Sequence, residues 1–134
     1  MEKKLEAVKA FHAAFHIGHR EIPKADLGTP KNLLRYKLMR EENEEYLEAA
    51  NANDLVEVAD ALADMLYILC GTIIEHGLQY KIEEIFDEIQ KSNMSKLGAD
   101  GKPIYREDGK VLKGPHYFKP DIPGILNNES RIED

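Results

Sequence analysis

Two short stretches of the sequence carry carboxylates at spacings that could hold a divalent metal ion. Six acidic residues are involved: Glu41, Glu42 and Glu45 in EENEE, and Glu57, Asp60 and Asp64 in VEVADALAD. Neither stretch offers Cys or His at a matching helical position, so the donors are oxygens only. Such a hard donor set favours Mg²⁺, with Mn²⁺ as a substitute, over zinc.

The second stretch lies in a segment that is expected to form a buried helix. From Leu55 to Cys70, the only residues with charged side chains are Glu57, Asp60 and Asp64, and the others are apolar or aromatic. At about 100° per residue, the three acids share an arc of about 60°. Like charges on a partly buried face repel one another and lose hydration, so they need a counter-charge. This helix contains no Lys or Arg, which leaves a divalent cation as the simplest solution.

The first stretch poses the same problem on the preceding predicted helix, LLRYKLMREENEEYLEAA. Its three glutamates fall within an arc of about 100° and are interleaved with leucines and an alanine. The inward face of this helix is therefore expected to be acidic as well. The solvated side is expected to hold Arg35, Lys37, Arg40 and Glu44.

The order of these motifs resembles that of the MazG-like, all-α nucleoside triphosphate pyrophosphohydrolases. EENEEYLEA fits the EExxE pattern, EVAD fits ExxD, and DALADMLYILCGTIIEHGL is similar to the core helix of this superfamily. The segments SNMSKLGADGKPI and KGPHYFKPDI look like the tail of its stand-alone phosphoribosyl-ATP-pyrophosphohydrolase-like members. Together these segments cover most of residues 5 to 122.

This resemblance implies an enzyme that cleaves a nucleotide between its α and β phosphates and releases a nucleoside monophosphate and pyrophosphate. Carboxylates on facing helices would hold Mg²⁺ ions, which bridge phosphate oxygens and lower the pKa of a bound water. Glu41 is assigned as the catalytic base, and Glu57 as a further ligand or as a residue that supports one. The residues assigned to metal are Glu42, Glu45, Glu57, Asp60 and Asp64.

One position leaves the choice of ligands on the second helix open. If Asp64 is aligned with the family aspartate that precedes a similar apolar run, the glutamate expected three residues earlier is Ala61. The nearest acids are then Asp60 and Glu57, which share a stripe with Asp64. Either alignment brings two carboxylates to the same place, so which of the three bind metal stays open.

Basic and polar residues towards the C-terminus are the candidates for substrate binding. A triphosphate that approaches an acidic site needs cations in addition to the metal. The segments KSNMSK and KGPHYFK supply lysines, and an amide at a helix end can read a base edge or a sugar hydroxyl. The predicted substrate-binding residues are Lys91, Asn93, Lys96, Lys113 and Tyr117.

Other kinds of chemistry fit the sequence less well. A di-iron bundle would show inward Glu-x-x-His pairs, and neither acidic stretch contains one. His12 and His16 are four residues apart and could bind a soft metal, but no further regular ligand accompanies them. A different class stays open, namely a non-catalytic helical module whose acidic seam binds metal structurally or meets a basic partner helix.

Helical periodicity and terminal signals predict an all-α, four-helix bundle. Thr29 followed by Pro30 suits an N-cap and first-turn pair, Asn53 or Asp54 suits the N-cap of the next helix, and Gly77 suits a helix end. The expected helices cover approximately residues 3–17, 30–50, 54–76 and 81–91.

The glycine- and proline-rich segment after the fourth helix is expected to be irregular. Asp108 and Gly109 between two apolar stretches indicate a short β-hairpin. The last dozen residues are expected to fray. In the first helix, Phe11 and Phe15 share a face with Val8 and are expected in the core rather than as a base-stacking platform.

The bulk composition fits one domain over residues 1–134, with a helical core at about 3–92 and a tail at about 93–134. A net charge of −7 disfavours a nucleic-acid polymer or an anionic membrane surface as the main partner. We find no secretory signal or membrane span, so a cytoplasmic location is expected.

Two further expectations concern the apolar third helix. Cys70 is the only cysteine of the chain and is expected to be a reduced core residue. The helix is apolar over most of its circumference, which is more than a four-helix monomer covers easily. A homodimer or a higher homo-oligomer is therefore expected.

Overall fold

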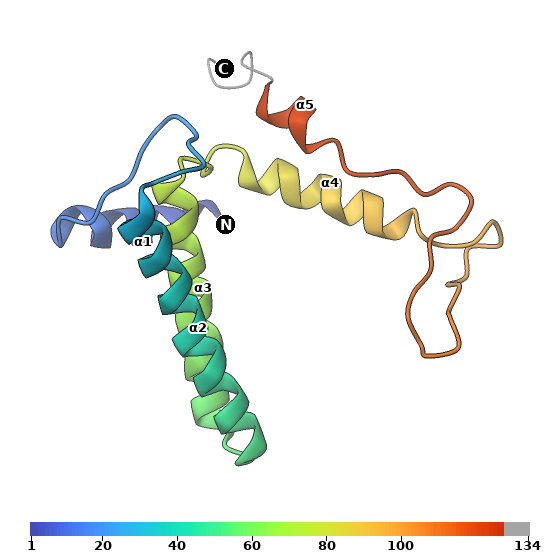
Figure 1. Ribbon diagram of the computed structural model, residues 1–134, viewed down its shortest axis with the longest axis horizontal. Coiled ribbons are helices and arrows are strands. Elements are labelled where there is room, and N and C mark those ends of the chain that lie inside the picture. Colours follow the sequence, from blue (N-terminus) through green and yellow to red (C-terminus); the bar gives the residue numbers. More distant parts are fainter. Residues whose placement is uncertain (128–134) are drawn as a thin grey trace. The chain divides into compact units, whose positions relative to one another are not determined.

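The computed structural model describes residues 1–127, which form helices joined by irregular segments (Figure 1). The chain divides into two compact units, Met1–Gln79 and a second unit from Tyr80 onward. The first contains α1 (Glu2–Ala14), α2 (Thr29–Asn51) and α3 (Leu55–Glu75), and the second contains α4 (Ile82–Met94) and α5 (Ile122–Leu126). The expected all-α class is confirmed. Within residues 1–127, no helix is both long and apolar enough to cross a membrane.

The first unit is built on the long hairpin of α2 and α3, which lie side by side (Figure 1). The turn between them follows the sequence signals, because Asp54 caps α3 by accepting a hydrogen bond from the Glu57 amide at 3.2 Å. Helix α1 packs against α3 and buries Leu5 and Val8. Cys70 is buried and unpaired, as expected.

The C-terminal end of α3 is closed by the loop that follows α1. Gly77 adopts a positive φ of 72°, a conformation that suits glycine and ends the helix. The Arg20 amide donates to the carbonyl oxygen of Ile74 at 3.1 Å, and the Lys24 amide donates to that of His76 at 2.9 Å. These bonds satisfy carbonyl groups that a helix end leaves without partners.

Two local expectations for the first unit are wrong. The N-cap of α2 is Gly28, and Thr29 is already helical, with Pro30 in the first turn. Phe11 and Phe15 are 37% and 65% exposed, so they are not core residues of this chain. Phe11 instead contacts Phe15 and Tyr67, with ring centroids 4.5 and 5.6 Å apart respectively.

The second unit consists of α4 and the irregular segment that folds back along it. The Ser92 hydroxyl donates to the carbonyl oxygen of Phe118 at 2.8 Å, and the Gly114 amide donates to that of Lys96 at 2.8 Å. These bonds tie the glycine-rich segment to the C-terminal end of α4.

The predicted β-hairpin is wrong, although a tight turn is present at the expected place. Tyr105 and Val111 form one isolated antiparallel bridge, and no strand occurs in residues 1–127. Asp108 accepts a hydrogen bond from the Lys110 amide at 3.1 Å, and Gly109 has a φ of 88°. The turn thus satisfies its own polar groups without a continuing ladder.

Helix α5 was not expected, since it lies in the stretch predicted to fray. Asp121 caps it by accepting a hydrogen bond from the Gly124 amide at 3.0 Å, and Pro123 stands in its first turn. The remainder of that stretch, residues 128–134, lies outside the described residues.

Candidate functional site

Four of the six predicted carboxylates lie near one another on α2 and α3. Glu42 and Glu45 are one turn apart on α2, and Asp60 and Asp64 are one turn apart on α3. Asp60 and Asp64 both act electrostatically on Glu42, so the two pairs lie near each other across the helices, and we call the four residues the acidic seam.

The electrostatics of Glu42 show how close the members of the acidic seam lie. The pKa of Glu42 is raised to about 7, first by desolvation, next by a hydrogen bond and repulsion from Glu45, and then by Asp64 and Asp60. Its Oε2 atom is buried and has no hydrogen-bond partner within residues 1–127. An unsatisfied buried carboxylate oxygen among other carboxylates is a position that a cation would stabilise.

The other two predicted acids lie beside the acidic seam. Glu41 is exposed, next to Glu42 on α2. Glu57 is also exposed and lines a hollow of about 230 Å³ together with Glu45, Glu48 and Asp54. Sequence reasoning missed Glu48 as a member of this acidic surface, although it follows Glu45 by three residues and therefore shares its side of the helix.

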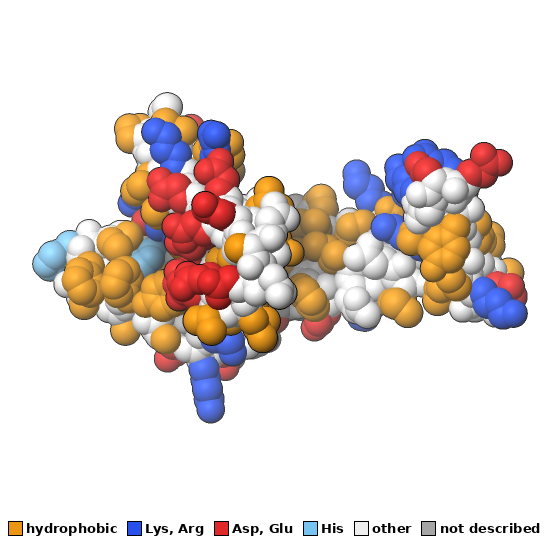
Figure 2. All heavy atoms as spheres, turned by 90° about the horizontal axis from the view of Figure 1, so that it is seen from below, with side chains coloured by type: hydrophobic (Ala, Val, Ile, Leu, Met, Phe, Trp, Pro, Cys, Tyr) orange, Lys and Arg blue, Asp and Glu red, His pale blue; other side chains and the backbone are white. Residues whose placement is uncertain are grey.

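Protein cations do not neutralise this group of acids. Within residues 1–127, none of the six carboxylates forms an ion pair with Lys, Arg or His, whereas neighbouring Arg40 pairs with Glu44 at 3.1 Å on the exposed side. Figure 2 shows acidic side chains gathered over the α2 and α3 hairpin, with hydrophobic side chains beside them. The negative charge of these six carboxylates can therefore attract a cation from solution.

The donor set suits Mg²⁺ or Mn²⁺, but the side chains are not pre-arranged around one point. No group of three or more His, Cys, Asp or Glu residues in the described part of the chain is placed to hold a metal ion. Glu45 and Asp60 are exposed, so their side chains are free to rotate towards an ion between the helices. Carboxylate oxygens are suitable ligands for Mg²⁺ or Mn²⁺. The side-chain conformations of these residues do not surround a single metal position.

A second group of charged residues lies further along the same hairpin, and it contradicts one expectation. Arg35 was expected on the solvated side of α2, yet it is only 7% exposed. Its Nε donates to the Thr72 hydroxyl at 3.0 Å and its Nη2 donates to the Ile68 carbonyl at 2.9 Å. Glu75, which is 2% exposed, lies 3.8 Å from Arg35 Nε and 3.3 Å from Lys31 Nζ.

The predicted substrate-binding residues all belong to the second unit. Lys91 and Asn93 are exposed near the end of α4, and Lys96 follows the helix. The Lys113 ammonium lies 4.8 Å from the centroid of the Tyr117 ring, a cation–π contact.

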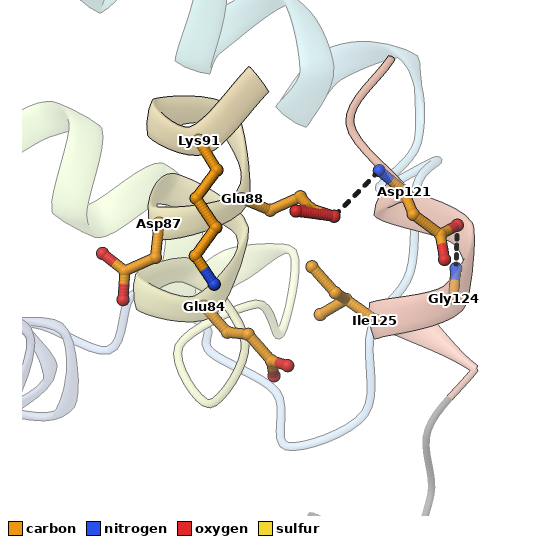
Figure 3. Close-up of a pocket in the computed structure, with 7 residues that line it drawn as sticks. All are labelled: Glu84, Asp87, Glu88, Lys91, Asp121, Gly124 and Ile125. Carbon is orange, nitrogen blue, oxygen red and sulfur yellow. Dashed lines mark hydrogen bonds between the residues drawn. The ribbon is translucent and has the colours of Figure 1, made fainter. Parts of the chain in front are cut away.

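Lys91 also borders a hollow of about 500 Å³ between α4 and α5 (Figure 3). Its neighbours there are acidic, because Glu84, Asp87 and Glu88 line the same hollow. Glu88 accepts a hydrogen bond from the Asp121 amide at 3.1 Å, which ties α4 to the start of α5 (Figure 3). The acidic lining of this hollow does not attract phosphate. The hollow therefore does not support a contact between Lys91 and a phosphate group.

An all-α chain with glutamates and aspartates on two paired helices is consistent with the MazG-like pyrophosphohydrolase superfamily. The chain belongs to the phosphoribosyl-ATP pyrophosphohydrolase family, whose model matches residues 8–93. That match includes all six predicted acids, whereas Lys96, Lys113 and Tyr117 lie beyond it. The protein is therefore a hydrolase acting on pyrophosphate bonds.

One solved structure extends the likeness over nearly the whole chain. It is the crystal structure of a candidate NTP pyrophosphohydrolase from Exiguobacterium sp. 255-15. The two proteins are 25% identical with a TM-score of 0.50, and the match covers 97% of this chain and 94% of the other. No curated protein matches the chain.

Proposed function

We propose that the protein is a Mg²⁺-dependent nucleotide pyrophosphohydrolase that cleaves between the α and β phosphates. The products would be a nucleoside monophosphate and pyrophosphate. The observation that carries this proposal is the buried Oε2 atom of Glu42, which has no hydrogen-bond partner within residues 1–127 and lies near further carboxylates of α2 and α3. The family match adds the type of bond that is cleaved.

Each acid has a separate part in this proposal. Glu42 and Glu45 on α2, with Asp60 and Asp64 on α3, would hold the metal, and Glu57 stands at the edge of the group as a further ligand. Bound Mg²⁺ supplies neutralisation of the phosphate oxygens and lowers the pKa of water. Glu41, which is exposed and adjacent to Glu42 in the sequence, would accept the proton from the attacking water.

The product pattern tests the assignment of the bond. We would incubate the whole chain with Mg²⁺ and a panel of ribo- and deoxyribonucleoside triphosphates and phosphoribosyl-ATP in ¹⁸O-labelled water. A nucleoside monophosphate with pyrophosphate is the expected pair, and the label then shows which phosphorus atom is attacked. A nucleoside diphosphate with orthophosphate would contradict the cleavage site. Folded protein that turns over no member of the panel would favour the non-catalytic module instead.

A leucine stripe on α3 supports a homodimer as the working form, and we include this assembly in the proposal. Leu55, Leu62, Leu66 and Leu69 share one side of the helix, opposite Asp60 and Asp64 by the 100° rotation per residue. All four leucines are exposed in the single chain, Leu55 by 80%. A continuous apolar stripe of this kind is typical of an interface, and a second copy of α3 would cover it.

The assembly is tested by placing a charge in the leucine stripe. We expect Leu66→Glu to convert a dimer into a monomer in sedimentation or light-scattering measurements, because a buried unpaired carboxylate opposes association. Lys37→Glu on the exposed side of α2 is the matched control and should leave the mass unchanged. Wild-type protein that is monomeric at concentrations well above those of the assay would contradict the dimer.

A further inference from the structure

The buried charges around Arg35 have no place in the chemistry described above. Arg35 extends from α2 to α3 and forms two hydrogen bonds there, to the Thr72 hydroxyl and to the Ile68 carbonyl. The Thr72 hydroxyl in turn donates to the same Ile68 carbonyl at 2.9 Å. We call Arg35, Ile68, Thr72 and Glu75 the Arg35 clamp.

The surroundings of the clamp are shaped to admit the guanidinium group. A Cβ atom on Gly71 would lie 2.7 Å from Arg35 Nη2 and 2.8 Å from His12 Nε2, so a larger residue there would require these side chains to shift. His12 is itself held in place, because its Nδ1 lies 3.0 Å from the Gly18 carbonyl oxygen. Burial lowers the pKa of Arg35, and the negative charge of Glu75 opposes that shift.

Arg35 lies on the same face of α2 as Glu42, and Glu75 lies on the same face of α3 as Asp64. Seven residues separate Arg35 from Glu42, which is two helical turns and a distance of about 10 Å along the axis. On α3, Thr72 follows Asp64 by eight residues, so it lies at a matching distance in the antiparallel hairpin. A shift of α3 along α2 would break both Arg35 hydrogen bonds and move Asp60 and Asp64 relative to Glu42 and Glu45.

We propose that Arg35 is a positioning residue for the metal site. The two hydrogen bonds of its guanidinium group fix the register in which α2 and α3 present their carboxylates. This inference rests on the proposed function, since it assigns Arg35 a role in holding the acidic seam ready for a divalent cation. Two directed hydrogen bonds from one planar guanidinium group favour a single register of the two helices. In this proposal Arg35 acts through the helix register and is assigned no contact with substrate or metal.

The test measures metal binding without nucleotide, using Mn²⁺ alone and electron paramagnetic resonance to count the free ion. Arg35→Lys keeps the positive charge beside Glu75 but loses the guanidinium group, and Thr72→Val removes the hydroxyl that accepts from it. Both changes are expected to weaken Mn²⁺ binding about tenfold, as is typical when a residue that orients metal ligands is removed. Thr72→Ser retains the hydroxyl and is expected to bind Mn²⁺ as the wild type does.

A control separates register from general stability. Ile74→Val removes a buried methyl group from α3 without touching the clamp, and lowers thermal stability on its own account. The inference is overturned if Ile74→Val weakens Mn²⁺ binding as much as Arg35→Lys does, or if Thr72→Ser fails to restore it. It is also overturned if Arg35→Lys and Thr72→Val bind Mn²⁺ as the wild type does, which leaves the proposed function intact. Wild-type protein that binds no Mn²⁺ overturns the proposed metal site and this inference together.

Discussion

Replacement of Asp64 by Asn is expected to abolish nucleotide turnover while the helices stay folded. The change removes a negative charge and a metal-binding oxygen but keeps the shape of the side chain. Loss of a group that merely orients metal ligands costs about 10- to 100-fold, so loss of a ligand should lower kcat/KM by at least about a hundredfold. Glu45→Gln is expected to behave in the same way, and circular dichroism checks that the helical content is unchanged.

The same variants should reveal the repulsion within the acidic seam. Without metal, Asp64→Asn relieves one of the like-charge interactions that raise the pKa of Glu42, so its melting temperature should equal or exceed that of the wild type. Glu44→Gln is the matched control, since Glu44 is adjacent to Glu45 in sequence but pairs with Arg40 on the exposed side. Full activity in Asp64→Asn, or an equal loss in Glu44→Gln, would remove Asp64 from the metal site.

The second large effect concerns pH. The pKa of Glu42 rises from 4.5 to about 7 in the folded chain, so the folded state binds this proton more tightly than the unfolded state does. The resulting stabilisation is complete below about pH 4.5 and is lost as the pH rises through about 7. Metal-free wild-type protein should therefore lose stability between pH 5 and about pH 7.5. The Glu42→Gln variant lacks this carboxyl group and should not show this part of the loss.

Thermal melting in the presence of a chelator, at a series of pH values, measures this difference. Since other groups titrate in the same range, the informative quantity is the wild-type melting temperature minus that of Glu42→Gln at each pH. Saturating Mg²⁺ should flatten the wild-type curve, because a bound cation favours the charged carboxylate and displaces its proton. Parallel curves for the two proteins in chelator would show that Glu42 ionises normally in the fold.

Local patterns in the sequence predict the long helices because each has its own periodicity and end signals. Asp54 and Gly77 act at the ends of α3 as expected. The tail is different, since Asp108 and Gly109 do form a turn but the flanking residues make only one bridge. Helix α5 is five residues long and contains Pro and Gly, so it has no periodicity that could predict it.

The acidic seam could be anticipated because like charges on apolar helices conflict with a simple core. The Arg35 clamp could not, because an arginine within a charged helix is usually solvated and its acceptors lie more than thirty residues away. Two signals were present in the sequence. Arg35 shares a stripe with Glu42, and Gly71 interrupts an apolar helix where a larger residue would be expected.

The exposed leucine stripe has a consequence for how the chain folds. The apolar residues buried in the first unit are few: Leu5, Val8, Ala49, Ala61, Cys70, Ile73 and Ile74. A separate chain thus gains little free energy from excluding water, and covering the stripe would add to that gain. If a second copy supplies the cover, mass action links folding to association, and the melting temperature should rise with protein concentration. Dilution would then act on this protein as a mild denaturant.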